Sequence, residues 1–142
     1  MPLKQEINVS SNWFELKIQG KPVGYFTEVS GLSAEVETMT YAEGGRNDYT
    51  HVLPTRMKYP NLVLKRGMTS TTALEDWFKQ TKTDPSRIVV TLTMYDEAKN
   101  TLRTWSFANA FPVKWAGPSF NAGQAQAATE TIEIVHEGIQ VL

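Results

Sequence analysis

The chain has 142 residues, a length that suits one domain, 1–142, with a single hydrophobic core. Its 14 Lys and Arg residues nearly balance its 15 Asp and Glu residues, so no strong field draws the protein to nucleic acid or to an anionic membrane. The absence of cysteine excludes disulfides and thiolate metal sites, and the small net charge leaves no long-range barrier to self-association.

The composition is that of a soluble globular protein, because 41% of the residues are hydrophobic and 20% are charged. No stretch reaches the roughly 18 apolar residues that a membrane span needs. The opening Met-Pro-Leu-Lys-Gln-Glu lacks the apolar core of a secretory signal. We therefore expect the protein to be made and folded in the cytoplasm.

Three segments near the start alternate apolar and polar residues, which is the period of a half-buried strand. In segment 13–18, for example, Leu16 belongs to the apolar face and Lys17 to the polar face. Segments 23–29 and 34–41 are rich in strand-forming residues and end at turn signals. The sequence therefore predicts three strands before residue 42.

The alternation is interrupted in segment 42–59, where Gly44, Gly45 and Pro54 are turn or breaker residues. Part of the segment still alternates between polar and apolar residues. We predict a long projecting loop or hairpin here, followed by a short strand over residues 61–66.

One helix is predicted over residues 71–80. Leu74 and Trp77 recur at helical spacing, acidic residues come early and lysines come late, as the helix dipole favours. Thr72 and Glu75 match a capping box, in which each side chain hydrogen-bonds a free backbone N–H at the start of the helix.

The rest of the chain again has strand patterns. The clearest is 87–95, a turn over 96–100 leads into 101–107, and 128–136 is the last strand. Before that last strand, segment 111–118 is aromatic and bounded by prolines. Seven or eight strands with one helix and no alternation of strand and helix indicate a mainly β (α+β) protein. The expected architecture is an antiparallel β-barrel or β-sandwich flanked by the helix.

The chain carries no strong catalytic or ligand-binding pattern. His51 and His136 have no partner at metal-ligand spacing, and no glycine-rich phosphate-binding loop is present. Glu35 and Glu37 would share a strand face, a spacing that acid/base chemistry can use, but a solvated face explains them equally well. We expect no enzymatic activity, no cofactor and no metal.

Aromatic residues are abundant, with 4 Trp, 5 Tyr and 6 Phe, and several cluster between Trp105 and Phe120. Most should lie in the core, and some suit contacts between subunits. An alternative from another functional class is a monomeric β-sandwich binding module that uses an exposed aromatic surface in this cluster.

A set of short motifs occurs in a characteristic order along the chain, from Trp13 to Ile139. Among them are YFTEVSGL (25–32), LVLKRG (62–67) and NAFPVKW (109–115). On these motifs the sequence resembles the tail tube proteins of contractile phages and of extracellular contractile injection systems, and more distantly the type VI secretion tube protein. Relatives often carry glycine where this chain has Thr55 and Pro60.

The resemblance implies a compact barrel or sandwich whose copies join into a six-membered ring, and rings that stack into a tube around a cargo channel. It implies several partners: identical copies, a surrounding sheath, baseplate, tube-initiator and spike proteins, and cargo in the lumen. It also implies synthesis in the bacterial cytoplasm and residence in a phage tail or an injection particle, which can be released from the cell. No nucleic-acid or membrane binding by the subunit is expected.

Two sets of candidate site residues follow from this resemblance and from the polar strand faces. The projecting segment 42–59 is expected to contact the next ring through Glu43, Gly44, Gly45, Arg46, Tyr49, His51, Leu53, Pro54, Arg56, Lys58 and Tyr59. The strand faces that carry Thr and Glu suit a wetted channel wall, for which the candidates are Glu35, Glu37, Thr91, Thr93, Thr129, Thr131 and Glu133.

Overall fold

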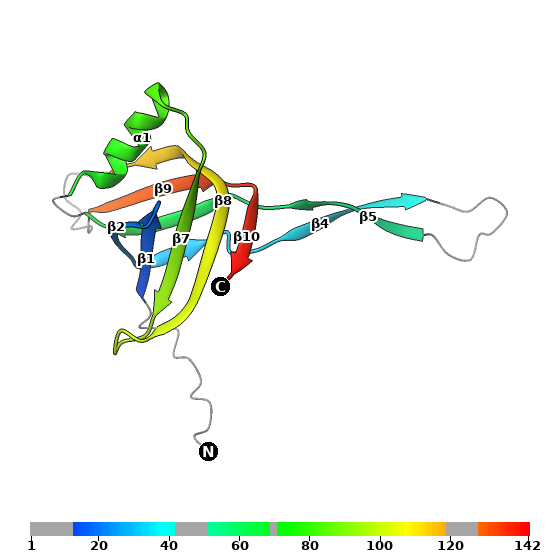
Figure 1. Cartoon of the computed structure of the whole chain (residues 1–142), viewed down its shortest axis with the longest axis horizontal. Helices are drawn as coiled ribbons and strands as arrows, with labels where there is room; N and C mark the ends of the chain where they lie inside the picture. The colour runs from blue at the N-terminus through cyan, green and yellow to red at the C-terminus, as the bar shows by residue number, and fades with distance from the viewer. Residues whose placement is uncertain (1–12, 42–50, 69–70, 119–127) are drawn as a thin grey trace, which may run out of the picture.

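The computed structural model describes residues 13–41, 51–68, 71–118 and 128–142 (Figure 1). The observed fold confirms the mainly β, antiparallel class with one helix. The elements in chain order are β1 (Trp13–Ile18), β2 (Lys21–Phe26), β3 (Glu28–Ser30), β4 (Glu35–Tyr41), β5 (His51–Lys58), β6 (Leu62–Gly67), α1 (Ala73–Thr83), β7 (Ile88–Tyr95), β8 (Thr101–Ala116), β9 (Thr129–Val135) and β10 (Gly138–Val141).

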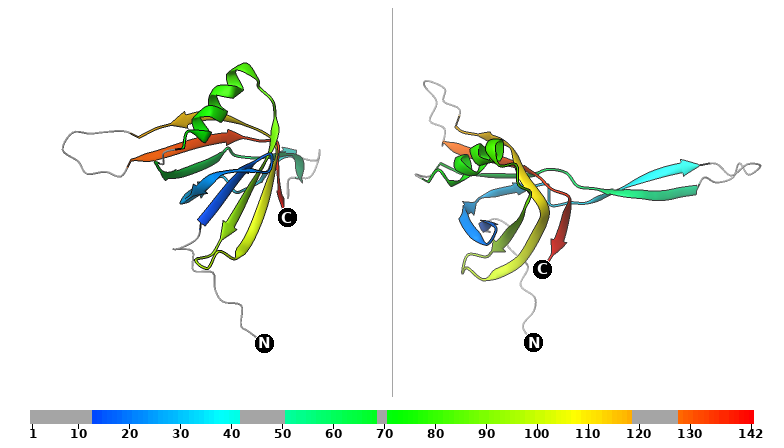
Figure 2. Two further views of the ribbon diagram at one scale, coloured as in Figure 1. Left: turned by 60° about the vertical axis from the view of Figure 1, so that its left-hand side comes forward. Right: turned by 45° about the horizontal axis from the view of Figure 1, so that its top comes forward.

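Eight strands form one antiparallel sheet in the order β2-β1-β7-β8-β9-β6-β3, with β10 paired to β8 outside this path. The two ends of the order meet, because only Thr27 separates β2 from β3, and the Thr27 N–H donates to the Lys65 carbonyl at 3.0 Å. The sheet therefore curls into a barrel of two layers, and the views in Figure 2 show the layers crossing at an angle.

Strand β8 belongs to both layers. Its first part pairs with β7 and β10, and its last part pairs with β9. The predicted end of this strand at Phe107 is wrong: one 16-residue strand bends and continues to Ala116, through most of the aromatic segment 111–118. The bend coincides with the left-handed backbone of Asn109 and with a shift of register between Pro112 and Lys114, both typical of a β-bulge.

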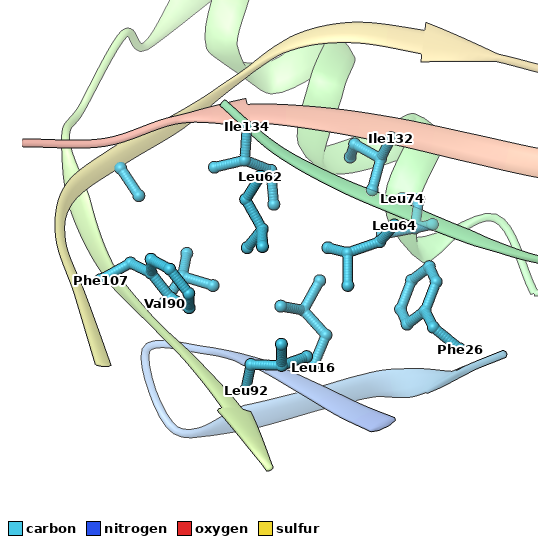
Figure 3. Packing of buried hydrophobic residues seen from close by; sticks show 11 residues of the cluster. Leu16, Phe26, Leu62, Leu64, Leu74, Val90, Leu92, Phe107, Ile132 and Ile134 are labelled. Atoms are coloured by element: carbon cyan, nitrogen blue, oxygen red, sulfur yellow. The ribbon is translucent and has the colours of Figure 1, made fainter. Parts of the chain in front are cut away.

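The core fills the barrel with side chains from both layers (Figure 3). Alternate residues of each strand point inward, as the period of two dictates. The helix adds Leu74, which is fully buried, and Trp77 packs against the same cluster. The buried cluster comprises Leu16, Phe26, Leu62, Leu64, Leu74, Val90, Leu92, Phe107, Ala110, Ile132 and Ile134.

The helix occupies residues 73–83 rather than 71–80, and the predicted capping box does not form. The Thr72 side chain makes no capping hydrogen bond; its hydroxyl donates to the Asp76 carboxylate at 3.0 Å. The Ala73 N–H donates instead to the Thr71 hydroxyl at 3.3 Å. A neighbouring threonine thus takes the role that the pattern had given to Thr72 and Glu75.

The predicted projecting segment is a hairpin in the part that the structure describes, because residues 51–58 form strand β5 and pair with β4. Pro54 is accommodated because the register shifts next to it, between Glu37 and Thr38, and bulges tolerate proline. Strand β10 was not predicted, since the sequence pattern ended the last strand at His136.

One ion pair is buried inside the barrel. Arg66 Nε lies 3.0 Å from Glu130 Oε2, and the two side chains are only 3% and 2% exposed. The Trp115 indole donates to the other Glu130 oxygen at 2.8 Å, and Arg66 Nη1 donates to the Val23 carbonyl at 3.0 Å. These contacts connect β2, β6, β8 and β9, so the pair links the two ends of the curled sheet.

Gly24 makes room for this arrangement. Its φ of +127° is a conformation that side-chain-bearing residues rarely adopt, and a Cβ here would lie 2.2 Å from Arg66 Nη1. Strand β2 can therefore approach the buried guanidinium only with glycine at this position.

We predict that Glu130→Ala lowers the free energy of unfolding by about 3–5 kcal/mol, because the charge of Arg66 would stay buried without its partner. Urea unfolding measures this change. The double variant Arg66→Met/Glu130→Leu removes both charges and should lose clearly less. Equal losses in the two variants would contradict the proposed role of the ion pair. As a control, Glu75→Ala, which breaks the pair between this half-buried side chain and the exposed Lys79, should cost less than about 1 kcal/mol.

Candidate assembly interface

The β4–β5 hairpin extends away from the barrel as a two-stranded ribbon (Figure 1). A ribbon of two strands is at best marginally stable in water unless something packs on it. Its side chains alternate between two faces, and the register of the pair defines which residues share each face.

One face of the hairpin is predominantly apolar. Cross-strand neighbours on it are Val36 with Met57, Thr38 with Pro54, and Thr40 with Val52. Val36, Met57 and Val52 are 43%, 49% and 59% exposed. We call this set of six residues the apolar face. An apolar surface exposed on a projecting arm is typical of a protein–protein contact.

The opposite face is charged near the barrel and apolar toward the tip. Glu35 lies across from Lys58, and the Arg56 side chain makes an ion pair and a hydrogen bond with Glu37. The Arg56 hydrogen bond holds the pKa of Glu37 below its usual range. The Thr55 hydroxyl donates to the Glu37 carbonyl at 2.9 Å and satisfies this acceptor beside the register shift.

Toward the tip of that same face, Met39 pairs with Leu53 and Tyr41 pairs with His51. The Tyr41 and His51 rings stack with their centroids 5.3 Å apart. Met39, Tyr41 and Leu53 are all more than 40% exposed. Both faces of the outer half of the hairpin therefore present surface that another molecule can cover.

Some of the predicted contact residues lie together on the hairpin, and others fall outside the residues that the structure describes. His51, Leu53, Pro54, Arg56 and Lys58 lie on β5, and Tyr59 follows at the base of the hairpin. Val36, Met39, Val52 and Met57 were not predicted; their signal is the strand period on β4 and β5. The candidates outside the described residues are Glu43, Gly44, Gly45, Arg46 and Tyr49.

The predicted wall residues fall on three different surfaces. Glu35 and Glu37 lie on the hairpin, and Thr91 and Thr93 lie on β7 in one layer of the barrel. Thr93 is only 6% exposed. The remaining candidates, Thr129, Thr131 and Glu133, lie together on β9 in the other layer, on its outward face.

The layer β3–β6–β9–β8 carries two cross-strand rows on its outward face, and we call this surface the outer layer face. The first row runs Glu28, Lys65, Thr131, Ala116, and the second runs Ser30, Val63, Glu133, Lys114. The two Lys and two Glu residues balance in charge. The sequence patterns missed Lys65 and Lys114 here because only the register shows that they lie beside Thr131 and Glu133.

Among the described residues, no group of three or more His, Cys, Asp and Glu side chains is arranged to hold a metal ion. In the same described part of the chain, no helix is long and apolar enough to span a membrane. The described aromatic residues of the Trp105–Phe120 cluster are buried or half-buried: Phe107 is in the core, and Trp105 and Trp115 pack against it. They do not form the exposed aromatic surface that a binding module requires.

His136 is buried at the base of the hairpin. Its ring lies 5.6 Å from that of Tyr59 and 4.8 Å from that of Phe107, measured between centroids. Burial lowers the pKa of His136 from its ordinary value of 6.5, and the backbone of Gly138 and Pro60 opposes the shift. The neutral imidazole is thus the form that the fold favours.

This pKa shift predicts a pH-dependent stability. Because the pKa is lower in the folded than in the unfolded chain, His136 contributes stability above about pH 6.5 that is lost as the pH falls through the lowered pKa. His136→Phe should remove this part of the pH dependence. Urea unfolding of both proteins at about pH 7.5 and about pH 5.5 tests it, and an unchanged pH dependence in the variant would contradict the assignment.

A small antiparallel barrel with a projecting arm that exposes an apolar face has the features of a subunit that associates with other chains. A family model described as T4-like virus tail tube protein gp19 matches residues 10–140, and the chain belongs to this family. It is a structural tube protein and not an enzyme.

Solved structures share the fold. A chain of an extracellular contractile injection system, the PVC sheath-tube complex in its extended state, has 24% identity and a TM-score of 0.82 over 99% of this chain and 93% of its own. A chain of the anti-feeding prophage tube-terminating cap has 23% identity and a TM-score of 0.82 over 100% and 94%. Hcp1 from Flavobacterium johnsoniae has 19% identity and a TM-score of 0.55 over 91% and 94%. No curated protein matches.

Proposed function

We propose that this tube protein assembles into hexameric rings that stack into the inner tube of a contractile injection particle. The observation that carries the proposal is the β4–β5 hairpin, whose apolar face has no cover within the described structure. A solvated monomer leaves this surface in water, whereas a neighbouring copy can bury it. The contacts between stacked rings are assigned to the hairpin.

Identical subunits in a ring must meet through two different surfaces, related by a rotation that closes. The barrel has unlike features on different sides: a hairpin that projects, and sheet edges that pair with no other described strand. Unpaired edges invite further strand pairing, and a closed ring removes them. Both features favour a ring of identical copies over a free monomer.

The outer layer face is our candidate for the channel wall. It carries Thr131 and Glu133 of the expected set, and Lys65 and Lys114 balance the carboxylates on the same surface. Thr91 and Thr93 lie on the other layer of the barrel, so they would face away from a channel lined by this surface. A wall of small polar and mixed charged groups suits passage without tight binding.

The partners we propose are a sheath around the tube, a baseplate with its tube initiator and spike, and cargo in the lumen. Chains of similar fold occur in complexes described as a sheath-tube complex, a baseplate and a cap. We place synthesis in the cytoplasm of a bacterium and the working protein in an assembled tail or extracellular particle.

The purified protein should form rings or tubes that negative-stain electron microscopy resolves, and sedimentation should show them at high concentration. A strictly monomeric protein at high concentration would count decisively against the proposal. It would favour the alternative, a monomeric binding module, which tryptophan fluorescence titration with candidate carbohydrate or protein ligands would then examine.

Val52→Asp places a charge in the middle of the apolar face. We expect tube formation to be lost while the unfolding free energy changes by no more than about 0.5 kcal/mol, because the side chain is exposed in the subunit. Electron microscopy and urea unfolding measure the two effects. The matched control is Ala98→Asp, which adds the same charge in the exposed turn between β7 and β8. If Val52→Asp formed normal tubes, the assignment of the hairpin to the contact between rings would be contradicted.

A further inference from the structure

Both strands of the β4–β5 hairpin join the barrel through segments that belong to no strand, residues 31–34 before β4 and residues 59–61 after β5. We call residues 59–61 the base segment. The two segments touch at Gly31, whose φ is +91° and where a Cβ would lie 2.1 Å from the Asn61 carbonyl oxygen. The Asn61 amide donates to the Glu133 carboxylate at 3.3 Å. Contacts of a few residues therefore define the orientation of the hairpin relative to the barrel.

His136 lies at this base, between β9 and β10, and is only 6% exposed. Its ring contacts the rings of Tyr59 in the base segment and of Phe107 on β8. Neither ring nitrogen makes a hydrogen bond of normal geometry to a described residue, although the backbone of Gly138 and Pro60 is close enough to oppose the fall in its pKa. The neutral imidazole is thus held in a mainly aromatic site.

The charged groups that neighbour His136 in the barrel are engaged in other contacts. Next in the chain, the Glu137 carboxylate accepts from Arg87 Nη1 at 2.8 Å and from Asn109 Nδ2 at 2.9 Å. The stretches of β8 and β10 that pair with each other carry no charged side chain.

The other titratable groups at the base are Tyr59, whose ring meets the imidazole, Lys58 before it, and Glu133, which already accepts a hydrogen bond. Lys58 lies across from Glu35 on the hairpin. A proton on His136 would therefore place a charge in an aromatic site with no acidic partner among the described residues. Such a charge is unfavourable unless water reaches it.

The two sides of the site differ in how firmly they are held. Phe107 lies on β8 between two strands, across from Val90 on β7 and from Ile139 on β10. Tyr59 and Pro60 lie outside any strand, and Pro60 has no backbone N–H to donate. The base segment is therefore the side that gives way when the imidazole gains a charge.

We propose that protonation of His136 in mild acid releases the base segment from the barrel, frees the hairpin from its fixed orientation and so prevents the stacking of rings. The proposal rests on the assembly proposed above and adds a condition that turns it off. The protein would then have a pH-sensitive switch at the base of its contact arm.

The direction of the effect follows from linkage between protonation and the opening of the base segment. The pKa of His136 is lowered while the segment is closed and returns toward its ordinary value of 6.5 when water reaches the ring. The closed form has its full advantage above about pH 6.5 and loses it as the pH falls through the lowered pKa. Returning the protein to neutral pH should restore the closed form, so the switch is reversible.

The assembly test measures the protein concentration for half-maximal tube formation, by sedimentation and electron microscopy. We compare about pH 7.5 with about pH 5.5, because free carboxylates remain ionised at both. For the wild type this concentration should rise about tenfold or more in acid and recover at neutral pH. His136→Phe keeps an aromatic ring that takes no proton, and its value should change no more than about twofold.

His51→Gln is the matched control, because the chain has two histidines and His51 lies on β5 of the same hairpin. The variant is compared by the ratio of its two assembly concentrations, so any effect at neutral pH cancels. This ratio should equal that of the wild type. A ratio near one in His51→Gln would assign the switch to His51 and overturn the proposal.

Hydrogen exchange of the wild-type protein, below the concentration at which it assembles, tests the hairpin directly. Rates are first corrected for the intrinsic pH dependence of amide exchange. The amides of β5 should lose protection about tenfold or more at about pH 5.5, whereas those of β7 in the barrel should keep theirs. An equal loss in both strands would mean general destabilisation, and no loss would mean a fixed hairpin; either result contradicts the proposal.

The outcomes separate this proposal from the assembly itself. A wild-type protein that assembles at neither pH overturns both. Tubes that form equally well at both pH values, or a pH dependence that His136→Phe retains, overturn the switch and leave the assembly standing. If circular dichroism shows that His136→Phe does not fold, His136→Gln and the exchange measurement on the wild type decide.

Discussion

Backbone hydrogen bonding of the strands is the constraint on which the whole structure depends. Every strand carries a row of N–H and C=O groups along each side, and an unmet row has to find a partner or water. Two features of the barrel pair many of these backbone groups. Strand β8 hydrogen-bonds with strands of both layers, and the chain passes from β2 directly into β3, which pairs with β6. The buried pair of Arg66 and Glu130 lies where this return takes place, and Gly24 gives it space.

The backbone groups that the barrel leaves without a strand partner lie on the surfaces that we assign to assembly. Among the described strands, the layer β3–β6–β9–β8 has edges that pair with no further strand, and the hairpin projects away from the barrel. A chain that hid all of its edges would be a self-sufficient globule. Membership of the tail tube family gives these exposed features a consistent meaning, since a tube is built only from copies that cover one another.

Much of the fold could be predicted from residue patterns. The alternation at 13–18 and 87–95 and the helical spacing around Leu74 and Trp77 correspond directly to β1, β7 and α1. Predictions failed at the ends of strands. The predicted end at Phe107 is wrong because the chain bends at Asn109 and β8 continues, and β10 after His136 was not predicted.

The candidate surfaces could be predicted only in part. A strand period tells which residues of one strand share a face, but not which strands become neighbours. Thr91 and Thr131 therefore looked alike in the sequence, although they lie on different layers. Glu28, Lys65 and Lys114 gain their meaning from cross-strand register, which depends on contacts between segments far apart in the chain.

The solid interior of the barrel has a consequence for any conduit built from it. Side chains from both layers fill the space inside each subunit, so nothing can pass through a single copy. A bore can open only between copies, and its width follows from how many strands surround it. Substitutions in the core would then alter the rigidity of the tube. The diameter of the channel would change only if a ring gained or lost a subunit.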